Sequence, residues 1–330
     1  ASSARVVLCV ELTAVRGHNT CLPGVTPYME NIMESFKIAA VSMNSPFDEL
    51  DWVFGQMDDY CREAANSAAR LVLFPELLIH SHCNPRTWEL AESVPDGPSV
   101  QRCIEMAKKY GLVLSVGISE KPRDVVFNTQ FLVGPDGYIG KQRKMHMSRD
   151  ETLYYKGGRE IEVHDLGFCK VGTIICYDNQ FPEVARILAL KGADVLLMPH
   201  AARLQNWDES PGSMAAARHH SIDFFTSCYA MRGRENACFA VLANMAGRAG
   251  QLDTYPADSP AQPHHCGGGL VFAPDGEVLA STQCDEIRDE MIVCHLDFSR
   301  LAAERSLPNY TVKTRRPELY GELIRLSDDS

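Results

Sequence analysis

Apolar residues recur along the chain at two spacings, one typical of amphipathic helices and one typical of buried strands. From Ser99 to Tyr110 they fall three or four positions apart, and the apolar run Leu112–Gly117 follows directly after Gly111. This pattern predicts a helix that ends at the glycine and leads into a strand. The same unit of helix, break and strand is predicted at three further places, over 48–69 with 70–74, 182–191 with 193–198 and 213–236 with 237–242.

Two other segments have short strands on either side of turn residues, which is the pattern of an antiparallel hairpin. Residues 130–133 and 138–141 flank Gly134-Pro-Asp-Gly137, and residues 269–273 and 277–280 flank Pro274-Asp-Gly276. Helices that alternate with mixed strands, without a linker or a low-complexity segment, predict one α/β domain over residues 29–330. Residues 247–265 are rich in Pro, Gly, Ala and Asp, so we expect a long loop that forms the wall or lid of a pocket.

The first 28 residues do not continue this pattern. The apolar stretch Arg5–Val15 is interrupted by Glu11, which is untypical of a signal peptide. Glycines, prolines and an asparagine break any regular structure between residues 17 and 27, and the strand-like run Lys37–Met43 comes soon after Met29. We therefore expect residues 1–28 to be a leader or extension outside the core fold.

Composition and charge say more about the function of the chain than about its fold. The 330 residues are 45% hydrophobic and 23% charged, which is ordinary for a globular protein with a large core. The formal charge of −11 argues against nucleic acid or an anionic membrane as a partner, because both require clustered Lys and Arg. No apolar run approaches the roughly 20 residues that span a bilayer. A small molecule is therefore the expected partner.

The twelve cysteines are scattered through the chain without a CxxC pair. A protein of this size does not need disulfides to hold its core together. We therefore expect free thiols and a reducing, cytoplasmic environment.

Three reactive side chains are expected where apolar strands give way to loops. Glu76 follows the strand 71–74, Lys144 follows the first hairpin, and Cys176 ends the apolar run 171–176. A thiol with a pKa of about 8.5 is mostly protonated at neutral pH, so a nucleophilic cysteine needs help. The dipole of the helix opened by Pro182 and a nearby ammonium would favour the thiolate. Hydrolysis also needs a carboxylate to take the thiol proton and later to activate water.

Three segments carry a resemblance to a known family. Phe-Pro-Glu76, Arg-Lys144-Met-His and Ile-Cys176-Tyr-Asp-Asn-Gln-Phe-Pro-Glu183, in this order, resemble the three signatures of the nitrilase superfamily of carbon–nitrogen hydrolases. Arg234-Glu-Asn236 and the segment 315–320 also fit that family. The resemblance implies a four-layer α-β-β-α sandwich, assembled as a homodimer or higher homo-oligomer. It also implies a Glu-Lys-Cys triad that requires no metal or organic cofactor.

The roles of the site residues follow from the same resemblance. Glu76 is the general base, Lys144 is the cationic stabiliser and Cys176 is the nucleophile. The backbone N–H of Tyr177 joins Lys144 in the oxyanion hole, and Glu151 corresponds to the second glutamate of the family. Cys176 attacks a carbonyl carbon, ammonia leaves, and water activated by Glu76 hydrolyses the thioester.

The sequence around the nucleophile narrows the substrate class. Cys-Tyr-Asp resembles the amidase and carbamoyl-amidase branches more than nitrilases, in which Cys-Trp-Glu is usual. We expect hydrolysis of a small linear amide to an acid and ammonia; an alternative is an N-carbamoyl amine or amino acid amidohydrolase. Hydrolases of N-carbamoyl-D-amino acids usually have arginines just after the nucleophile, where this chain has Asn179 and Gln180. Arg203 is the candidate for an equivalent positive charge, and His200, Arg203 and Trp207 are the candidate substrate-binding residues.

Several single residues also allow other interpretations. His80, His82 and Cys83 have the chemistry of metal ligands, but no second cluster at zinc spacing accompanies them, so no metal is expected. His146 would suit a Cys-His peptidase, which would leave the glutamate and lysine motifs unexplained. Glu183 stands in the first turn of a helix, where a carboxylate favours the helix dipole. A nitrilase-fold binding protein without catalytic activity is the alternative from another functional class, and the intact triad argues against it.

Overall fold

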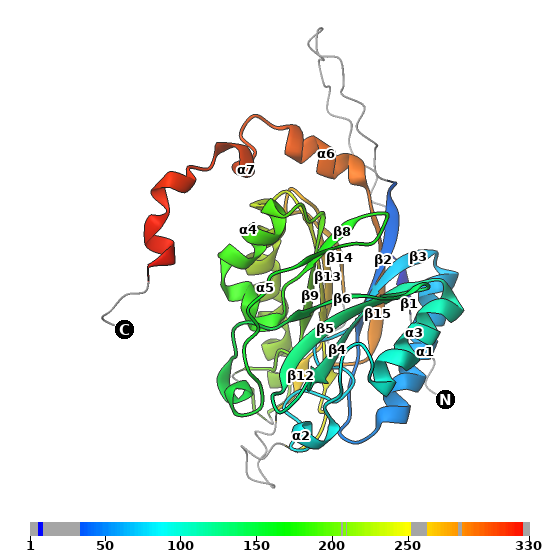
Figure 1. Cartoon of the computed structure of the whole chain (residues 1–330). Coiled ribbons are helices and arrows are strands. Elements are labelled where there is room, and N and C mark those ends of the chain that lie inside the picture. The colour runs from blue at the N-terminus through cyan, green and yellow to red at the C-terminus, as the bar shows by residue number, and fades with distance from the viewer. Residues whose placement is uncertain are drawn as a thin grey trace.

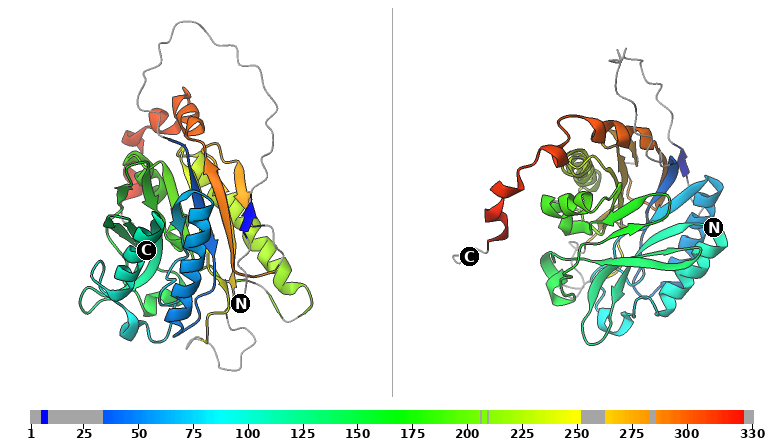
Figure 2. Two further views of the ribbon diagram at one scale, coloured as in Figure 1. Left: turned by 90° about the vertical axis from the view of Figure 1, so that its right-hand side faces the viewer. Right: turned by 45° about the horizontal axis from the view of Figure 1, so that its top comes forward.

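A computed structural model describes residues 6–8, 34–205, 207–208, 210–251, 263–282 and 286–325. Two β-sheets stack against each other in the middle of the molecule, and helices cover their outer faces (Figures 1 and 2). The predicted four-layer α-β-β-α sandwich is confirmed. None of the helices described is both long and apolar enough to cross a membrane.

The first sheet contains strands from both the N-terminal and the C-terminal part of the chain. In the described part of the chain its strand order is β1 (Val6–Leu8), β15 (Glu290–Leu296), β2 (Phe36–Ser42), β3 (Ala69–Leu73), β4 (Val113–Glu120), β5 (Phe127–Gly134) and β6 (Gly137–Arg143). Strands β2, β3 and β4 are parallel, whereas β5 and β6 continue as an antiparallel meander. Helices α1 (Leu50–Asn66) and α3 (Pro98–Tyr110) pack on the outer face of this sheet, and α2 (Thr87–Leu90) lies in the segment between β3 and α3.

The second sheet is built mainly from the later half of the chain. Its order is β14 (Val278–Ser281), β13 (Gly269–Phe272), β10 (Phe239–Asn244), β9 (Val195–His200), β8 (Lys170–Thr173) and β7 (Val163–Asp165). Strands β8, β9 and β10 are parallel. Helices α4 (Pro182–Leu190) and α5 (Ser213–Arg234) cover its outer face. A separate two-stranded ladder pairs β11 (Ala246–Gly247) with β12 (His265–Cys266).

The core between the sheets explains the continuous apolar runs within the central strands. Ile38 and Leu71 of the first sheet pack in one cluster with Leu197 and Val241 of the second. The opposite faces of these strands are buried under the helices. A strand that is buried on both faces has a continuous apolar sequence rather than an alternating one.

The predicted elements agree with the structure, apart from some boundaries. All four units of helix and strand and both hairpins are present, and α3 ends at Gly111 in a left-handed conformation with φ of 68°. The strand predicted to end at Cys176 stops at Thr173, and Cys176 begins a 3-10 turn, η2 (Cys176–Gln180). Strand β15 and helix α6 (Phe298–Ser306) were not predicted.

Two predictions fall largely on residues outside the described ranges. The leader over residues 1–28 is described only at β1, whose backbone pairs in parallel with β15, so the domain boundary stays a prediction. The loop over 247–265 is described only at its two ends, where β11 and β12 pair with each other.

Candidate active site

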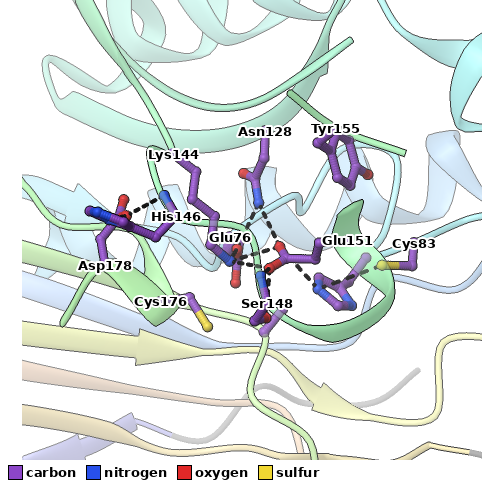
Figure 3. A network of polar contacts seen from close by, with 12 residues as sticks. Glu76, Cys83, Asn128, Lys144, His146, Ser148, Glu151, Tyr155, Cys176 and Asp178 are labelled. Atoms are coloured by element: carbon purple, nitrogen blue, oxygen red, sulfur yellow. Dashed lines mark hydrogen bonds and ion pairs between the residues drawn. The ribbon is translucent and has the colours of Figure 1, made fainter. Parts of the chain in front are cut away.

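The three predicted catalytic residues stand at the ends of strands from both sheets. Glu76 follows β3 and Lys144 follows β6 of the first sheet, whereas Cys176 follows β8 of the second sheet. Figure 3 shows the three side chains gathered in one cluster with Glu151 and Asn128. The cluster therefore depends on the stacking of the sheets, and it lies where ligands bind in many α/β proteins, at the carboxyl ends of parallel strands.

The ammonium group of Lys144 forms the centre of the cluster. Its Nζ lies 2.7 Å from Glu76 Oε1 and 2.7 and 2.8 Å from the two carboxylate oxygens of Glu151. All three side chains are fully buried. Burial alone would lower the pKa of Lys144, but the negative charges of Glu76 and Glu151 outweigh it and raise that pKa well above its usual value. Lys144 is therefore a buried cation.

The two oxygens of Glu76 have different environments. Oε1 accepts hydrogen bonds from Lys144 Nζ and, at 2.7 Å, from Asn128 Nδ2. Oε2 is buried and has no hydrogen-bond partner among the described residues. Oε1 therefore fixes the carboxylate, and Oε2 is the atom available to accept a proton.

Glu151 is fixed by the turn on which it stands. It lies in the 3-10 helix η1 (Arg149–Leu153), where Ser148 N and Ser148 Oγ donate to Glu151 Oε2 at 2.8 and 2.7 Å. Asn128 Nδ2 donates to its other oxygen at 3.2 Å. Burial would raise the pKa of Glu151, but Lys144 and His82 lower it well below its usual value. Glu151 is therefore an ionised partner that holds Lys144 in place.

Cys176 has a strained backbone and a protonated side chain. Its φ of 48° lies in the left-handed region that L-residues rarely adopt, and Asn179 Nδ2 stabilises the turn by donating to Ile174 O and Cys176 O. Burial and the charge of Glu76 raise the pKa of the thiol well above its usual value, against the opposing effects of Lys144 and the Ala201 N–H. The ammonium of Lys144 thus favours the thiolate, as expected from the sequence, but burial and the charge of Glu76 outweigh it.

A cavity of about 640 Å³ opens beside Cys176. Aromatic side chains of α5, Phe224, Phe225 and Tyr229, form part of its wall, and Tyr177 and His200 also line it. The cavity therefore combines an apolar wall with the half-buried thiol, as expected of a pocket for a small molecule.

The structure places the three candidate substrate-binding residues differently. His200 and Arg203 line the cavity, whereas Trp207 is not among its lining residues and packs edge to face on His264. The guanidinium of Arg203 lies 3.2 Å from Asp150 Oδ2 and 3.2 Å from His82 Nδ1. Arg203 is thus already engaged by a carboxylate of the chain, which argues against its predicted role as the anchor of a substrate carboxylate.

The residues considered as metal ligands face different partners. His80 lies 3.4 Å from Glu92, and His82 lies 3.4 Å from Glu151. Donor atoms of Glu76, His82 and Glu151 do lie within 4.8 Å of one another. The ammonium of Lys144 already contacts both of these carboxylates, so the chain itself supplies a positive charge at this position.

The chain also matches a known protein family. The model of the family described as carbon-nitrogen hydrolase matches residues 37–305. The chain belongs to the carbon–nitrogen hydrolase family. Its resemblance to the nitrilase superfamily, inferred from three short motifs, is thereby confirmed.

Several proteins resemble this carbon–nitrogen hydrolase in sequence, and others resemble it in structure. A protein of Pyrococcus abyssi named nitrilase is 31% identical over 295 residues, which cover 86% of this chain and 98% of that protein. The N-carbamoylputrescine amidase of Arabidopsis thaliana is 26% identical over 275 residues, 80% of this chain and 87% of that protein. The crystal structure of a carbon–nitrogen hydrolase from Helicobacter pylori shares the fold, with a TM-score of 0.77 at 21% identity over 90% of this chain and all (100%) of that chain. The chain is therefore an enzyme of this hydrolase class.

The residues that hold Glu76 and Glu151 of this carbon–nitrogen hydrolase in place were not predicted from the sequence. Asn128 and Ser148 donate to the carboxylates, and Gly117 of β4 allows the backbone at Glu76 to approach, since a Cβ there would lie 2.1 Å from Leu77 N. Such contacts depend on strand register, and no pattern in the sequence indicates them. Asp178 stands inside the Cys176 motif and could have been identified there.

Asp178 links the segment after Lys144 to the turn that carries Cys176. Its Oδ1 accepts hydrogen bonds from His146 N at 2.8 Å and from His146 Nδ1 at 2.7 Å, and its Oδ2 lies 3.2 Å from Met145 N. The ring of His146 stacks on Phe181 with centroids 3.8 Å apart. His146 is thus engaged by Asp178 in joining the two loops, so the peptidase alternative has no support in its contacts.

Replacing Asp178 by alanine should separate these two loops. We expect Asp178→Ala to lower kcat about ten- to a hundredfold, because small displacements of reacting groups cost about this much, and to leave KM less affected. Asp178→Asn keeps one acceptor oxygen and should fall between wild type and Asp178→Ala. Steady-state kinetics together with melting temperatures would check this. An unchanged kcat in a destabilised Asp178→Ala protein would show that the residue is only structural.

Proposed function

We propose that this carbon–nitrogen hydrolase cleaves a small linear amide through a thioester on Cys176, with an acid and ammonia as products. The observation that carries the proposal is the contact of the Lys144 ammonium with Glu76 and Glu151, at 2.7 Å each, in the cluster beside Cys176. It supplies a base, a cation and a nucleophile in one place. Burying three charged side chains costs free energy of folding, and such clusters are found mostly at functional sites.

The proposed reaction begins with the protonated thiol. Glu76 Oε2 takes the proton of Cys176 as the sulfur attacks the carbonyl carbon, and Lys144 with the N–H of Tyr177 stabilises the oxyanion. Glu76 then gives this proton to the leaving nitrogen, so that ammonia departs and a thioester remains. Water, deprotonated by Glu76, attacks the thioester, and the proton passes to the sulfur as the acid leaves. Glu151 keeps Lys144 charged and oriented throughout.

The nature of the acyl group is supported by fewer observations. The Cys-Tyr-Asp sequence favours an amidase or carbamoyl amidase over a nitrilase, and the names of the relatives include both nitrilase and carbamoyl amidase. A carbamoyl amino acid is the less favoured alternative. Asn179 and Gln180, which stand where arginines would bind its carboxylate, donate instead to Cys176 O and Tyr229 OH.

Ammonia release from aliphatic amides, ω-amides and N-carbamoyl compounds tests the proposal. Wild type should release ammonia from at least one class, and Cys176→Ala should release none. Mass spectrometry after brief exposure to substrate should show an acyl adduct on Cys176. The matched control is Cys228→Ala, which removes another half-buried thiol and should behave as wild type. If wild type and Cys176→Ala are equally inert across the panel and an unrelated protein binds tightly, the protein is the catalytically inactive scaffold.

We also propose that copies of the chain associate through their C-terminal arm, residues 307–325. The first part of the arm is held on the body, where Tyr310 and Thr311 donate hydrogen bonds to the backbone oxygens of Asn236 and Glu235. The arm then continues past α4 (Figures 1 and 2), and its short helices α7 (Thr311–Thr314), η3 (Pro317–Leu319) and η4 (Gly321–Ile324) have no buried residue. Leu319, Leu323 and Ile324 are 65%, 67% and 87% exposed. Grouped exposed apolar side chains are typical of a contact surface.

Truncation of the arm should change the oligomeric state. We expect light scattering to show a dimer or higher oligomer for the whole chain and a smaller species for a variant that ends at Ser306. A monomeric whole chain at micromolar concentration would contradict the association.

The cysteines described are free thiols, and we propose the cytoplasm, a reducing compartment, as the location.

A further inference from the structure

The imidazole of His200 is held rigidly in the wall of the catalytic cavity. His200 is the last residue of β9, is 1% exposed and lines the same cavity as Cys176. Its ring packs against Phe225 and Tyr229 of α5, with centroids 5.5 and 5.1 Å away. The next residue, Ala201, directs its backbone N–H to the thiol of Cys176. His200 is thus a neighbour of the nucleophile with little freedom to move.

The hydrogen bonds of His200 define which nitrogen carries the proton. Nδ1 lies 3.0 Å from the backbone oxygen of Met198, and a carbonyl only accepts, so Nδ1 is the protonated nitrogen. Burial, together with the positive charge of Lys144, lowers the pKa of His200 to about 3, so a second proton does not bind at neutral pH. Nε2 therefore presents a lone pair.

That lone pair lacks a partner. Nε2 is buried and makes no hydrogen bond to any residue that the structure describes. A buried acceptor without a donor is unfavourable and uncommon in proteins. Because His200 stands in a cavity wall, a molecule that fills the cavity can supply the missing donor.

The arrangement of the triad indicates which part of the substrate meets His200. The leaving nitrogen must face Glu76, which protonates it, and Glu76 and Lys144 are fully buried and are not among the residues lining the cavity. The group on the other side of the carbonyl carbon must therefore extend into the cavity. The atom of this group that is bonded to the carbonyl carbon would then lie beside the cavity wall that contains His200.

We propose that His200 Nε2 accepts a hydrogen bond from an N–H attached to the scissile carbonyl carbon, so that the preferred substrates are ureides (N-carbamoyl amines) rather than carboxamides. The inference rests on the proposed function and names its substrate class. A ureide has an N–H where a carboxamide has a methylene, and only the N–H satisfies Nε2. Ammonia leaves from the carbamoyl group as before, Cys176 keeps a thiocarbamate, and water releases the carbamic acid.

The test compares pairs of substrates that differ only in this one group. Butylurea and hexanamide have the same number of heavy atoms, with N–H in one and CH₂ in the other. The same pair with a terminal ammonium or a terminal carboxylate separates this effect from recognition of the chain end. We expect wild type to favour the ureide by about tenfold or more in kcat/KM within each pair that it hydrolyses.

Variants of His200 connect this preference to one atom. His200→Leu removes the acceptor, and the ratio of kcat/KM for ureide over carboxamide should fall about tenfold. His200→Gln places an amide oxygen near the position of Nε2 and should keep part of the ratio. Because both substrates are measured on one preparation, the ratio does not depend on how much of a variant is folded.

Failure of this inference and failure of the proposed function give different results. A wild-type ratio near one, or a ratio that both variants leave unchanged, would overturn the role of His200 while amide hydrolysis stands; water would then be the partner of Nε2. If wild type releases ammonia from neither member of any pair and Cys176 forms no adduct, the proposed function fails and the inference with it.

Discussion

Replacing Lys144 by methionine is expected to abolish most of the activity and to destabilise the fold. Lys144 contacts both Glu76 and Glu151, and all three side chains are fully buried. Loss of one oxyanion donor lowers kcat by about 10²–10³-fold. Removing the cation also leaves two buried carboxylates without the positive charge that they share, which costs about 3–5 kcal/mol in the free energy of unfolding.

The pH dependence of this loss has a definite sign. In the wild type, Lys144 and His82 hold the pKa of Glu151 well below its usual value, so its contribution to stability is present above the pKa of the unfolded chain and disappears as the pH falls through the folded pKa. Without Lys144, burial meets less opposition and raises the pKa of Glu151. The variant therefore gains protons on folding, and its deficit in stability should be largest near neutral pH and smaller in mild acid.

Denaturant unfolding at neutral and at mildly acidic pH would measure this difference, with Lys141→Met as the matched control. Lys141 pairs with Glu120 at 2.6 Å and is partly exposed, and Glu120 keeps Arg143 as a second partner. Lys141→Met should therefore retain activity and lose less stability than Lys144→Met. Equal effects of the two substitutions would show that Lys144 acts only as one more buried charge.

The sequence was most informative where strands end in chemically distinctive residues. Glu76, Lys144 and Cys176 were identified because each terminates an apolar run within a motif, and parallel strands bring such ends to one edge of a sheet. The residues that orient them, Asn128 and Ser148, were not identified. Their contacts arise from strand register and from a loop that folds back, and neither leaves a periodic pattern.

The electrostatic state of Cys176 also required the structure. The motif indicates a cysteine near a helix N-terminus and a lysine, which by themselves favour a thiolate. The structure adds burial and the adjacent charge of Glu76, both of which raise the pKa of the thiol. The balance between these effects depends on distances that spacing along the chain does not give.

Replacing Glu76 by glutamine should therefore lower the rate of substrate hydrolysis and raise the reactivity of the Cys176 thiol. Without its general base the enzyme should lose about 10²–10⁴-fold in kcat. The same substitution removes a negative charge that raises the pKa of Cys176, whereas Lys144, still held by Glu151, continues to lower it. The fraction of thiolate at neutral pH should rise, and alkylation of Cys176 by iodoacetamide should become several-fold faster.

The rate of iodoacetamide alkylation, followed by mass spectrometry across a range of pH, would give the pKa of Cys176 in wild type and in Glu76→Gln. Cys228, a second half-buried thiol among the described residues, provides an internal control in the same spectra, since its rate should not change. Lys144→Met should slow alkylation of Cys176, because it removes the cation that opposes burial. Slower alkylation in Glu76→Gln would mean that Glu76 favours the resting thiolate, and the attack would then start from a preformed ion pair rather than from a proton transfer to Oε2.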